Sequence, residues 1–134
     1  MADPADGRQR IPALSPFEEE AGFTRALRTG RRIVVSGTVG VEADGNVAEG
    51  AGAQADRCFA LIREHIEQLG GQMGDVIRVR MFVTDIAYAD DVTAAFSRAL
   101  RHVRPTGTLV AIAALYDPRW KVEIEAEAEI GAGQ

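Results

Sequence analysis

Residues 120–130 alternate without a break between apolar and charged side chains, and this alternation constrains the fold more than any other feature of the chain. A period of two predicts a β-strand with one face in a core, because successive side chains of a strand point to opposite faces. The apolar face would carry Trp120, Val122, Ile124, Ala126, Ala128 and Ile130. The other face would carry Lys121, Glu123, Glu125, Glu127 and Glu129. Such a charged face meets either water or cations, and the sequence leaves both open.

The preceding segment, Thr108 to Leu115, is a nearly continuous apolar run that predicts a strand covered on both faces. Between the two segments, residues 116–119 contain the turn signal Asp117-Pro118. The simplest interpretation is a β-hairpin that forms the middle of a sheet.

The rest of the chain predicts two helices and three more strands. Apolar residues at period two indicate strands, and an apolar stripe at spacings of three and four indicates helices. The strands are expected at residues 22–27, 33–41 and 75–84, and the helices at residues 53–69 and 91–102, the second capped by Asp90.

The resulting order, β-β-α-β-α-β-β, predicts an α+β fold with one mixed sheet and both helices on one face of that sheet. The length suits one domain, residues 1–134, which is large enough to bury a core without disulfides or metal ions as cross-links. The polar residues 1–12 are expected to form a flexible or loosely docked tail.

Helices on one face leave the opposite face of the sheet uncovered. The apolar side chains of the strand at 75–84 would pack against the helices, namely Ile77, Val79, Met81 and Val83. The other face of that strand carries Arg78 and Arg80, which we expect to pair with glutamates of residues 120–130, within one chain or between chains. Identical subunits are the simplest cover for this face and for the apolar run, so the pattern predicts a homo-oligomer.

Composition excludes several classes of function. A net charge of −5 without a basic stripe argues against nucleic-acid binding, which needs clustered Lys and Arg. No apolar run is long enough to span a membrane, and the first residues have no apolar core of signal-peptide type, so a cytoplasmic protein without a membrane partner is expected. The single cysteine, Cys58, is interpreted as a small buried hydrophobe without metal-ligand spacing around it, and His65 and His102 as surface or structural residues.

Two short features are candidates for ligand contact. Ser36 and Gly37 interrupt the second strand, where a glycine marks either a bulge or the close approach of a ligand. Phe17 follows Ser15-Pro16 near the start of the fold, either as a packing residue or as a ligand contact.

Six short segments stand in a specific order and spacing: Ser15-Pro16-Phe17, Val35-Ser36-Gly37, Gly74-Asp75-Val76, Phe82-Val83-Thr84-Asp85, Arg104-Pro105 and Val122-Glu123-Ile124-Glu125-Ala126. Through these segments the chain resembles, from residue 15 to residue 130, the RidA/YjgF family of imine deaminases, also called endoribonuclease L-PSP. It implies a chorismate-mutase-like fold and a homotrimer with small-molecule ligands in clefts between subunits. Family members with deaminase activity hydrolyse reactive enamines and imines, such as 2-aminoacrylate, without a metal or organic cofactor.

The sequence departs from the deaminase pattern where the substrate would bind. The resemblance implies an arginine two residues after Pro105 that pairs with a substrate carboxylate, but Gly107 stands there. Leu109 stands where a cysteine is common, and Phe17 replaces a tyrosine. Loss of the guanidinium removes roughly 1.5–3 kcal/mol, or about one to two powers of ten in affinity. The chain is therefore expected to be a divergent member and not a typical 2-imino acid deaminase.

Arg104 or Arg119 could supply a replacement guanidinium from a neighbouring subunit, although two solvent-exposed arginines are the simpler interpretation. Gly107 and Thr108 would leave a roomier, less basic cleft in which backbone N–H groups can act as donors.

Glu123 matches the glutamate that is thought to orient the attacking water in the family. A carboxylate in a partly apolar cleft, here beside Phe17 and Leu109, can have a raised pKa and act as a general acid or base. The alternative is structural: Glu123 pairs with Arg78 or Arg80 and holds the trimer together. Three other glutamates share its face and cannot all be catalytic, which favours this alternative.

Three functions remain open. The chain is a Rid-like hydrolase of a small imine or enamine, a metabolite-binding trimer without turnover, or a ribonuclease, against which the acidic charge argues. The candidate site has Glu123 as its catalytic residue and, for substrate binding, Phe17, Ser36, Gly37, Gly107, Thr108 and Leu109.

Overall fold

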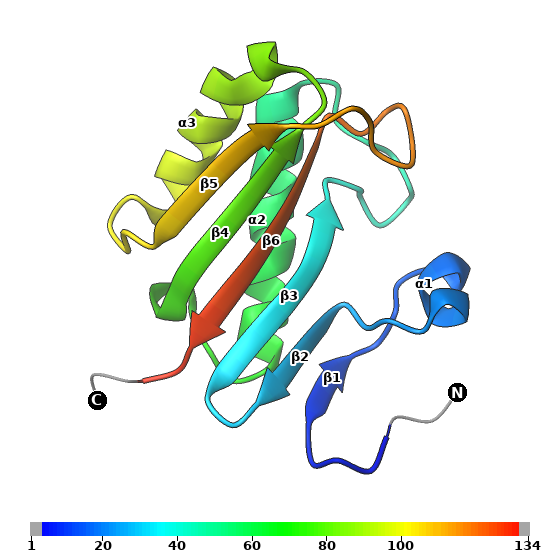
Figure 1. Cartoon of the computed structure of the whole chain (residues 1–134), viewed down its shortest axis with the longest axis vertical. Helices are drawn as coiled ribbons and strands as arrows, with labels where there is room; N and C mark the ends of the chain where they lie inside the picture. Colours follow the sequence, from blue (N-terminus) through cyan, green and yellow to red (C-terminus); the bar gives the residue numbers. More distant parts are fainter. Residues whose placement is uncertain (1–3, 132–134) are drawn as a thin grey trace.

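One mixed β-sheet with two long helices on one face makes up most of the computed structural model, which describes residues 4–131 (Figure 1). The strands are β1 (Gln9–Ile11), β2 (Ala26–Thr29), β3 (Arg32–Val39), β4 (Val76–Val83), β5 (Thr106–Ala111) and β6 (Val122–Glu129). The helices are α1 (Pro16–Ala21), α2 (Ala51–Gln68) and α3 (Ala89–Leu100), with 3₁₀ turns η1 (Met73–Asp75) and η2 (Ile86–Tyr88). None of the helices in residues 4–131 has the length and hydropathy that crossing a membrane requires.

The strands lie in the order β1-β2-β3-β6-β4-β5 across the sheet. Neighbouring strands are antiparallel except β4 and β5, which are parallel and have α3 between them in the chain. The predicted α+β class, the single mixed sheet and the helices on one face are confirmed, and the predicted order of elements holds from β2 onward.

The predicted central hairpin of residues 108–130 is wrong. β5 does not pair with β6: β5 is an edge strand beside β4, and β6 lies between β3 and β4. In β5 only Leu109 is half-buried, and the other side chains are exposed. The chain enters β5 through the α3 crossover and so runs parallel to β4, and a loop at 112–121 then carries it to the centre of the sheet.

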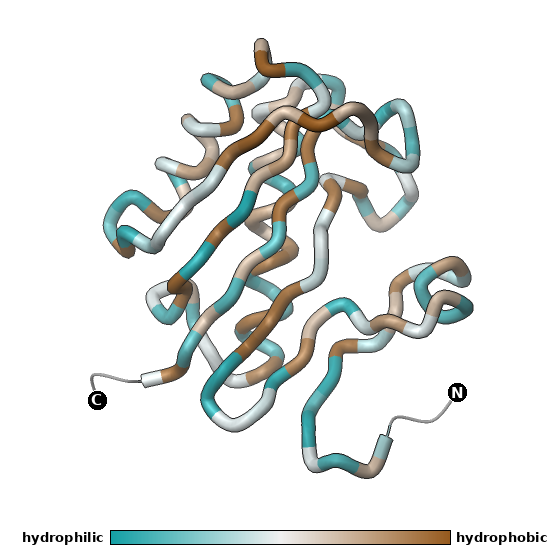
Figure 2. Tube along the Cα trace, in the orientation of Figure 1, coloured by the Kyte–Doolittle hydropathy of each residue, from teal (hydrophilic) through white to brown (hydrophobic). Residues whose placement is uncertain are grey.

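The core lies between the sheet and the two long helices. The apolar face of β6 is buried, as its alternation predicts, and α2 contributes a buried stripe that includes Cys58 and Ile62. Figure 2 shows hydrophobic and hydrophilic residues alternating along β4 and β6. The prediction for Ile77 is wrong, since its side chain is 39% exposed. An irregularity in pairing between Val76 and Arg78 interrupts the alternation there.

The N-terminal region contains two elements that the sequence did not predict. β1 pairs with β2, so Gln9–Ile11 are docked on the edge of the sheet, and residues 1–3 lie outside the described part of the chain. In α1, the Ser15 hydroxyl accepts a hydrogen bond from the Glu18 N–H at 3.2 Å, Pro16 occupies the first turn and Gly22 closes the helix in a left-handed conformation. These are ordinary helix-boundary residues, but six residues are too few to show a helical period.

The start of α3 also differs from the prediction. Asp90 lies inside the first turn together with Asp91, and Tyr88 occupies the cap position. Asp85 caps the preceding η2 instead, because its carboxylate accepts a hydrogen bond from the Ala87 N–H at 2.8 Å. Acidic residues in the first turn still favour α3 through the helix dipole.

The face of the sheet away from α2 and α3 is the open face, and its charged side chains are Arg32, Arg78, Arg80, Glu123, Glu125, Glu127 and Glu129. Arg80 pairs with Glu125 at 2.8 Å, which confirms the predicted contact within one chain. Arg32 of β3 pairs with Glu127 at 3.2 Å, a contact that the sequence did not predict. Exposed apolar side chains such as Val34, which is 41% exposed, lie among these charges.

Candidate functional site

The interruption of β3 at Ser36 and Gly37 is a β-bulge. The register of β3 against β6 shifts between Val35 and Thr38, so the bulge alternative is confirmed. The Ser36 hydroxyl is committed to the fold, because it donates to the Thr24 carbonyl at 2.7 Å. Ser36 therefore shapes the backbone of the candidate site.

Gly37 brings the β3 backbone against the Glu123 carboxylate. A Cβ atom at position 37 would lie 2.8 Å from Glu123 Cδ, so the close approach that a glycine allows is made by this side chain. Glu123 is half-buried, and its carboxylate forms no hydrogen bond or ion pair within residues 4–131. Burial raises its pKa, while the positive charge of Arg25 acts in the opposite direction. A carboxylate with a raised pKa takes up a proton more readily than an ordinary glutamate does, which suits a general acid or base.

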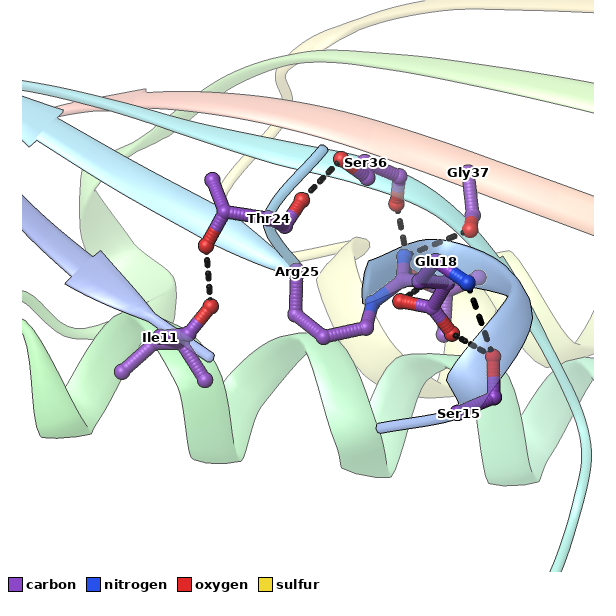
Figure 3. Close-up of polar contacts among 8 residues, drawn as sticks. Ile11, Ser15, Glu18, Thr24, Arg25, Ser36 and Gly37 are labelled. Atoms are coloured by element: carbon purple, nitrogen blue, oxygen red, sulfur yellow. Dashed lines mark hydrogen bonds and ion pairs between the residues drawn. The ribbon is translucent and has the colours of Figure 1, made fainter. Parts of the chain in front are cut away.

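Arg25 is a residue of this site that the sequence analysis missed. Its side chain is buried, and Figure 3 shows it reaching toward Glu18 and Gly37. Nη2 donates to the Gly37 carbonyl at 2.6 Å and Nη1 pairs with Glu18 Oε1 at 3.2 Å. Arg25 thus joins α1 to the bulge beside Glu123. Nothing in the segment Phe23-Thr24-Arg25 marks this arginine in the sequence, because its partners come from two other elements.

Phe17 stands on α1 next to Glu18 and belongs to an exposed aromatic cluster, which we define as Phe17, Phe23 and Tyr116. The ring centroids of Phe17 and Phe23 are 6.3 Å apart, and those of Phe17 and Tyr116 are 5.2 Å apart. Phe17 is 54% exposed and Tyr116 is 83% exposed. The cluster offers ring faces to a ligand.

The predicted site residues fall into two groups. The first half-site contains Phe17, Ser36, Gly37 and Glu123, with Arg25 holding α1 to the bulge. The second half-site contains Gly107, Thr108 and Leu109 of β5. β5 and β3 are separated by β6 and β4, three strand spacings or about 14 Å.

The second half-site does not meet Glu123 within one chain. Leu109 lies opposite the buried Met81 and packs against the core, so the expectation that Glu123 lies beside Leu109 is wrong for a single chain. Gly107 faces α3, since a Cβ there would lie 3.6 Å from the Phe96 ring. The order of strands explains the separation: the predicted hairpin would have made β5 a neighbour of β6.

Arg104 and Arg119 are the candidate replacements for the missing arginine. Within residues 4–131, neither forms a hydrogen bond or ion pair with a residue of the first half-site. Arg119 pairs with Asp117 at 2.9 Å, and this pairing lowers the pKa of the Asp117 carboxyl. Arg104 is exposed and adopts a left-handed backbone conformation with φ of 60° just before Pro105. The positive charge that acts on the Glu123 carboxyl is that of Arg25, which already has partners.

The remaining reactive side chains are placed for structural roles. Cys58 donates to the Thr38 carbonyl at 3.2 Å, and burial raises the pKa of its thiol to about 12, so a thiolate is strongly disfavoured. His65 is buried in α2 and His102 is exposed. Within residues 4–131, no group of three or more His, Cys, Asp or Glu side chains is arranged to hold a metal ion.

The fold and the site define a small α+β protein in which the Glu123 carboxylate, on the open face of one mixed sheet, has no ion-pair partner among residues 4–131. The family model for endoribonuclease L-PSP matches residues 14–130. An uncharacterised protein of Streptomyces coelicolor is 33% identical over 125 residues, which cover 92% of this chain and 93% of that protein. The chain therefore belongs to the endoribonuclease L-PSP family, also known as RidA/YjgF, and the resemblance seen in six short segments is confirmed.

Solved structures agree with this assignment. A member of the YjgF/YER057c/UK114 family from Mycobacterium tuberculosis is 33% identical and superposes with a TM-score of 0.84, covering 92% of this chain and 99% of that chain. RidA from an Antarctic Psychrobacter is 27% identical with a TM-score of 0.79, covering 90% of this chain and 94% of that one.

Proposed function

We propose that this protein is a hydrolase that acts on the C=N bond of a small imine or enamine, with Glu123 positioning the attacking water. The observation that carries the proposal is the half-buried Glu123 carboxylate, which lies against the Gly37 bulge without a hydrogen-bond partner in residues 4–131. A carboxylate with a raised pKa can take a proton from water as the water attacks the imine carbon. No cofactor is required for this chemistry.

We further propose that the protein works as a homotrimer whose ligand sites lie between subunits. Two observations support this assembly. The half-sites lie at separated positions in the sheet, so the second half-site of one subunit can complete the first half-site of its neighbour. The open face carries exposed apolar side chains among its ion pairs, and identical subunits would cover it. A monomer in sedimentation equilibrium at micromolar concentration would contradict this assembly.

The departure from the deaminase pattern supports a second function, the binding of a metabolite without turnover. Gly107 provides no guanidinium and Phe17 provides no hydroxyl, so the cleft could bind a metabolite without turning it over. Cleavage of RNA is disfavoured by the net charge of −5.

An imine-hydrolysis assay separates hydrolysis from binding alone. An amino-acid oxidase and an amine oxidase would generate imines from panels of amino acids and amines, and ammonia release would be followed with and without the protein. The hydrolase is expected to accelerate release from at least one imine and to lose the acceleration in Glu123→Gln. Glu125→Gln is the matched control, because Glu125 lies on the same face of β6 but is paired with Arg80. No acceleration across both panels would leave the binding function.

A further inference from the structure

The charges of the first half-site favour a cationic ligand. Arg25 is buried, and its Nη1 forms an ion pair with Glu18 Oε1 at 3.2 Å that neutralises its charge. Its Nη2 donates a hydrogen bond to the Gly37 carbonyl at 2.6 Å. Glu123 adds a second carboxylate to this group and forms no ion pair within residues 4–131. One guanidinium against two carboxylates leaves a negative charge that a ligand can neutralise.

The basic side chains of the loop before β6 are also engaged. Arg119 pairs with Asp117 at 2.9 Å in the same loop. The Lys121 ammonium donates to the Glu49 carbonyl and lies 5.6 Å from the centre of the Tyr88 ring. A ligand carboxylate would have to break one of these contacts to gain a cation from this loop.

The aromatic cluster adds exposed apolar surface on α1, the helix that supplies Glu18. Phe17 and Glu18, whose carboxylate holds Arg25, are consecutive residues of this helix. Tyr116 approaches from the loop before β6, where its ring lies 5.2 Å from that of Phe17. Exposed ring faces attract cations as well as apolar groups.

We propose that the ligand of this site is a small amine-derived cation, an iminium ion in the reactive case, with an aromatic or apolar substituent and without a carboxylate. The Glu123 carboxylate pairs with the nitrogen, and the aromatic cluster covers the substituent. This inference rests on the proposed function, because it names the substrate class of the same site. The substrate thus differs from a 2-imino acid in the group that the missing arginine would have bound.

The chemistry balances without an oxidant or reductant. An aldiminium ion, R–CH=NH₂⁺, reacts with water to give R–CHO and NH₄⁺. The C–O bond forms as the π electrons move to nitrogen, and Glu123 accepts a proton from the attacking water. The proton then passes to nitrogen as the C–N bond breaks. The reaction that must supply such a substrate is the two-electron oxidation of a primary amine.

Two unreactive probes of similar size test the preferred charge. Phenethylammonium and 3-phenylpropanoate have the same ring and nearly the same chain length but opposite charge, and calorimetric titration of the full-length protein would compare their affinities. We expect phenethylammonium to bind at least about tenfold tighter, as a charge-assisted hydrogen bond allows. Glu123→Gln should remove this preference and Glu125→Gln should keep it. Absence of phenethylammonium binding, or binding of the propanoate that is equal or tighter, overturns the inference.

Two imines that differ only in a carboxylate separate the inference from the proposed function. An amine oxidase converts phenethylamine to the aldimine, and an amino-acid oxidase converts phenylalanine to the corresponding 2-imino acid. We expect faster ammonia release from the aldimine alone. Preference for the 2-imino acid would keep the hydrolase and overturn the ligand class. No acceleration on either imine, together with Glu123-dependent binding of phenethylammonium, would reject the hydrolase and uphold the ligand class.

Tyr116→Ala tests the aromatic cluster without disturbing the core, because Tyr116 is 83% exposed. Loss of one ring face should weaken phenethylammonium binding about two- to fivefold. An unchanged affinity would overturn the assignment of this cluster to the ligand site.

Discussion

The two ends of the charged face of β6 look alike in the sequence but differ in the structure. At one end, Glu125 and Glu127 have arginine partners on β4 and β3, at 2.8 Å and 3.2 Å. At the other end, Glu123 lies against Gly37 and has no ion-pair partner in residues 4–131. The paired glutamates stabilise the sheet, whereas the unpaired carboxylate is held in a state that suits binding or proton transfer.

The difference arises from the neighbouring strands. β4 places Phe82 opposite Glu123 in the register, and β3 places Val39 there, just past the bulge, so neither strand supplies a cation at this position. The one buried guanidinium of the first half-site, Arg25, is turned to Glu18 and the Gly37 carbonyl. An alternating run of charges therefore contains both structural and candidate functional residues, and the neighbours decide which is which.

The largest expected effect comes from replacing Arg25, which joins α1 to the bulge beside Glu123. Arg25→Met leaves Glu18 without its cation and the Gly37 carbonyl without its donor, and should lower the free energy of unfolding by about 3 kcal/mol. Urea denaturation would measure the change. Arg98→Met is the matched control, because Arg98 pairs with Asp56 on an exposed surface, and it should change stability little. Equal losses in the two variants would show that burial does not distinguish these pairs.

A second substitution acts on the position of Glu123 itself. In Gly37→Ala the new Cβ would lie 2.8 Å from Glu123 Cδ, and the flexible carboxyl end must move away. We expect at least about a tenfold loss of ligand binding or turnover, while stability changes by no more than about 1 kcal/mol. Calorimetric titration and urea denaturation would measure the two quantities. Gly50→Ala, where a Cβ meets no atom within 4 Å, should leave binding unchanged.

The third prediction compares how the unpaired Glu123 and the paired Glu125 affect stability. Glu123→Gln removes a half-buried, unpaired charge and should raise the free energy of unfolding by up to about 1 kcal/mol, a value that already allows for screening by solvent. Glu125→Gln removes a partner of Arg80 and should give no such gain. Thermal unfolding of both variants at neutral pH tests the contrast. A clear destabilisation by Glu123→Gln would support the structural role that the sequence favoured.

The smallest effect is a dependence on pH. Burial raises the pKa of Glu123 in the folded protein, so the folded state binds more protons than the unfolded state between the ordinary glutamate pKa and the raised one. Wild-type stability due to Glu123 therefore increases as pH falls through this range, and the advantage of Glu123→Gln should disappear there. Urea denaturation of both proteins across the acidic range measures the difference. A constant difference between the two proteins would contradict a raised pKa.

Several parts of the fold and site could be predicted from the sequence because they depend on local periodicity. The alternation of residues 120–130 indicated which face of β6 is buried, and the glycine in β3 indicated a bulge. The contact between Arg80 and Glu125 followed from the faces of two strands. The family resemblance pointed to Glu123, but sequence reasoning favoured a salt bridge that the structure gives to its neighbour Glu125.

The sequence by itself determined the α+β class, the two long helices and the charged open face, because hydrophobic periods of two and of three to four fix which side of each element is buried. Only the tertiary structure decided that β6 lies between β3 and β4, that β5 is at the edge, and that Arg25 joins α1 to the bulge beside Glu123. A period reports the buried face of a strand and carries no information about which strand lies beside it. The partners of a buried charge are likewise set by segments that meet only when the chain folds.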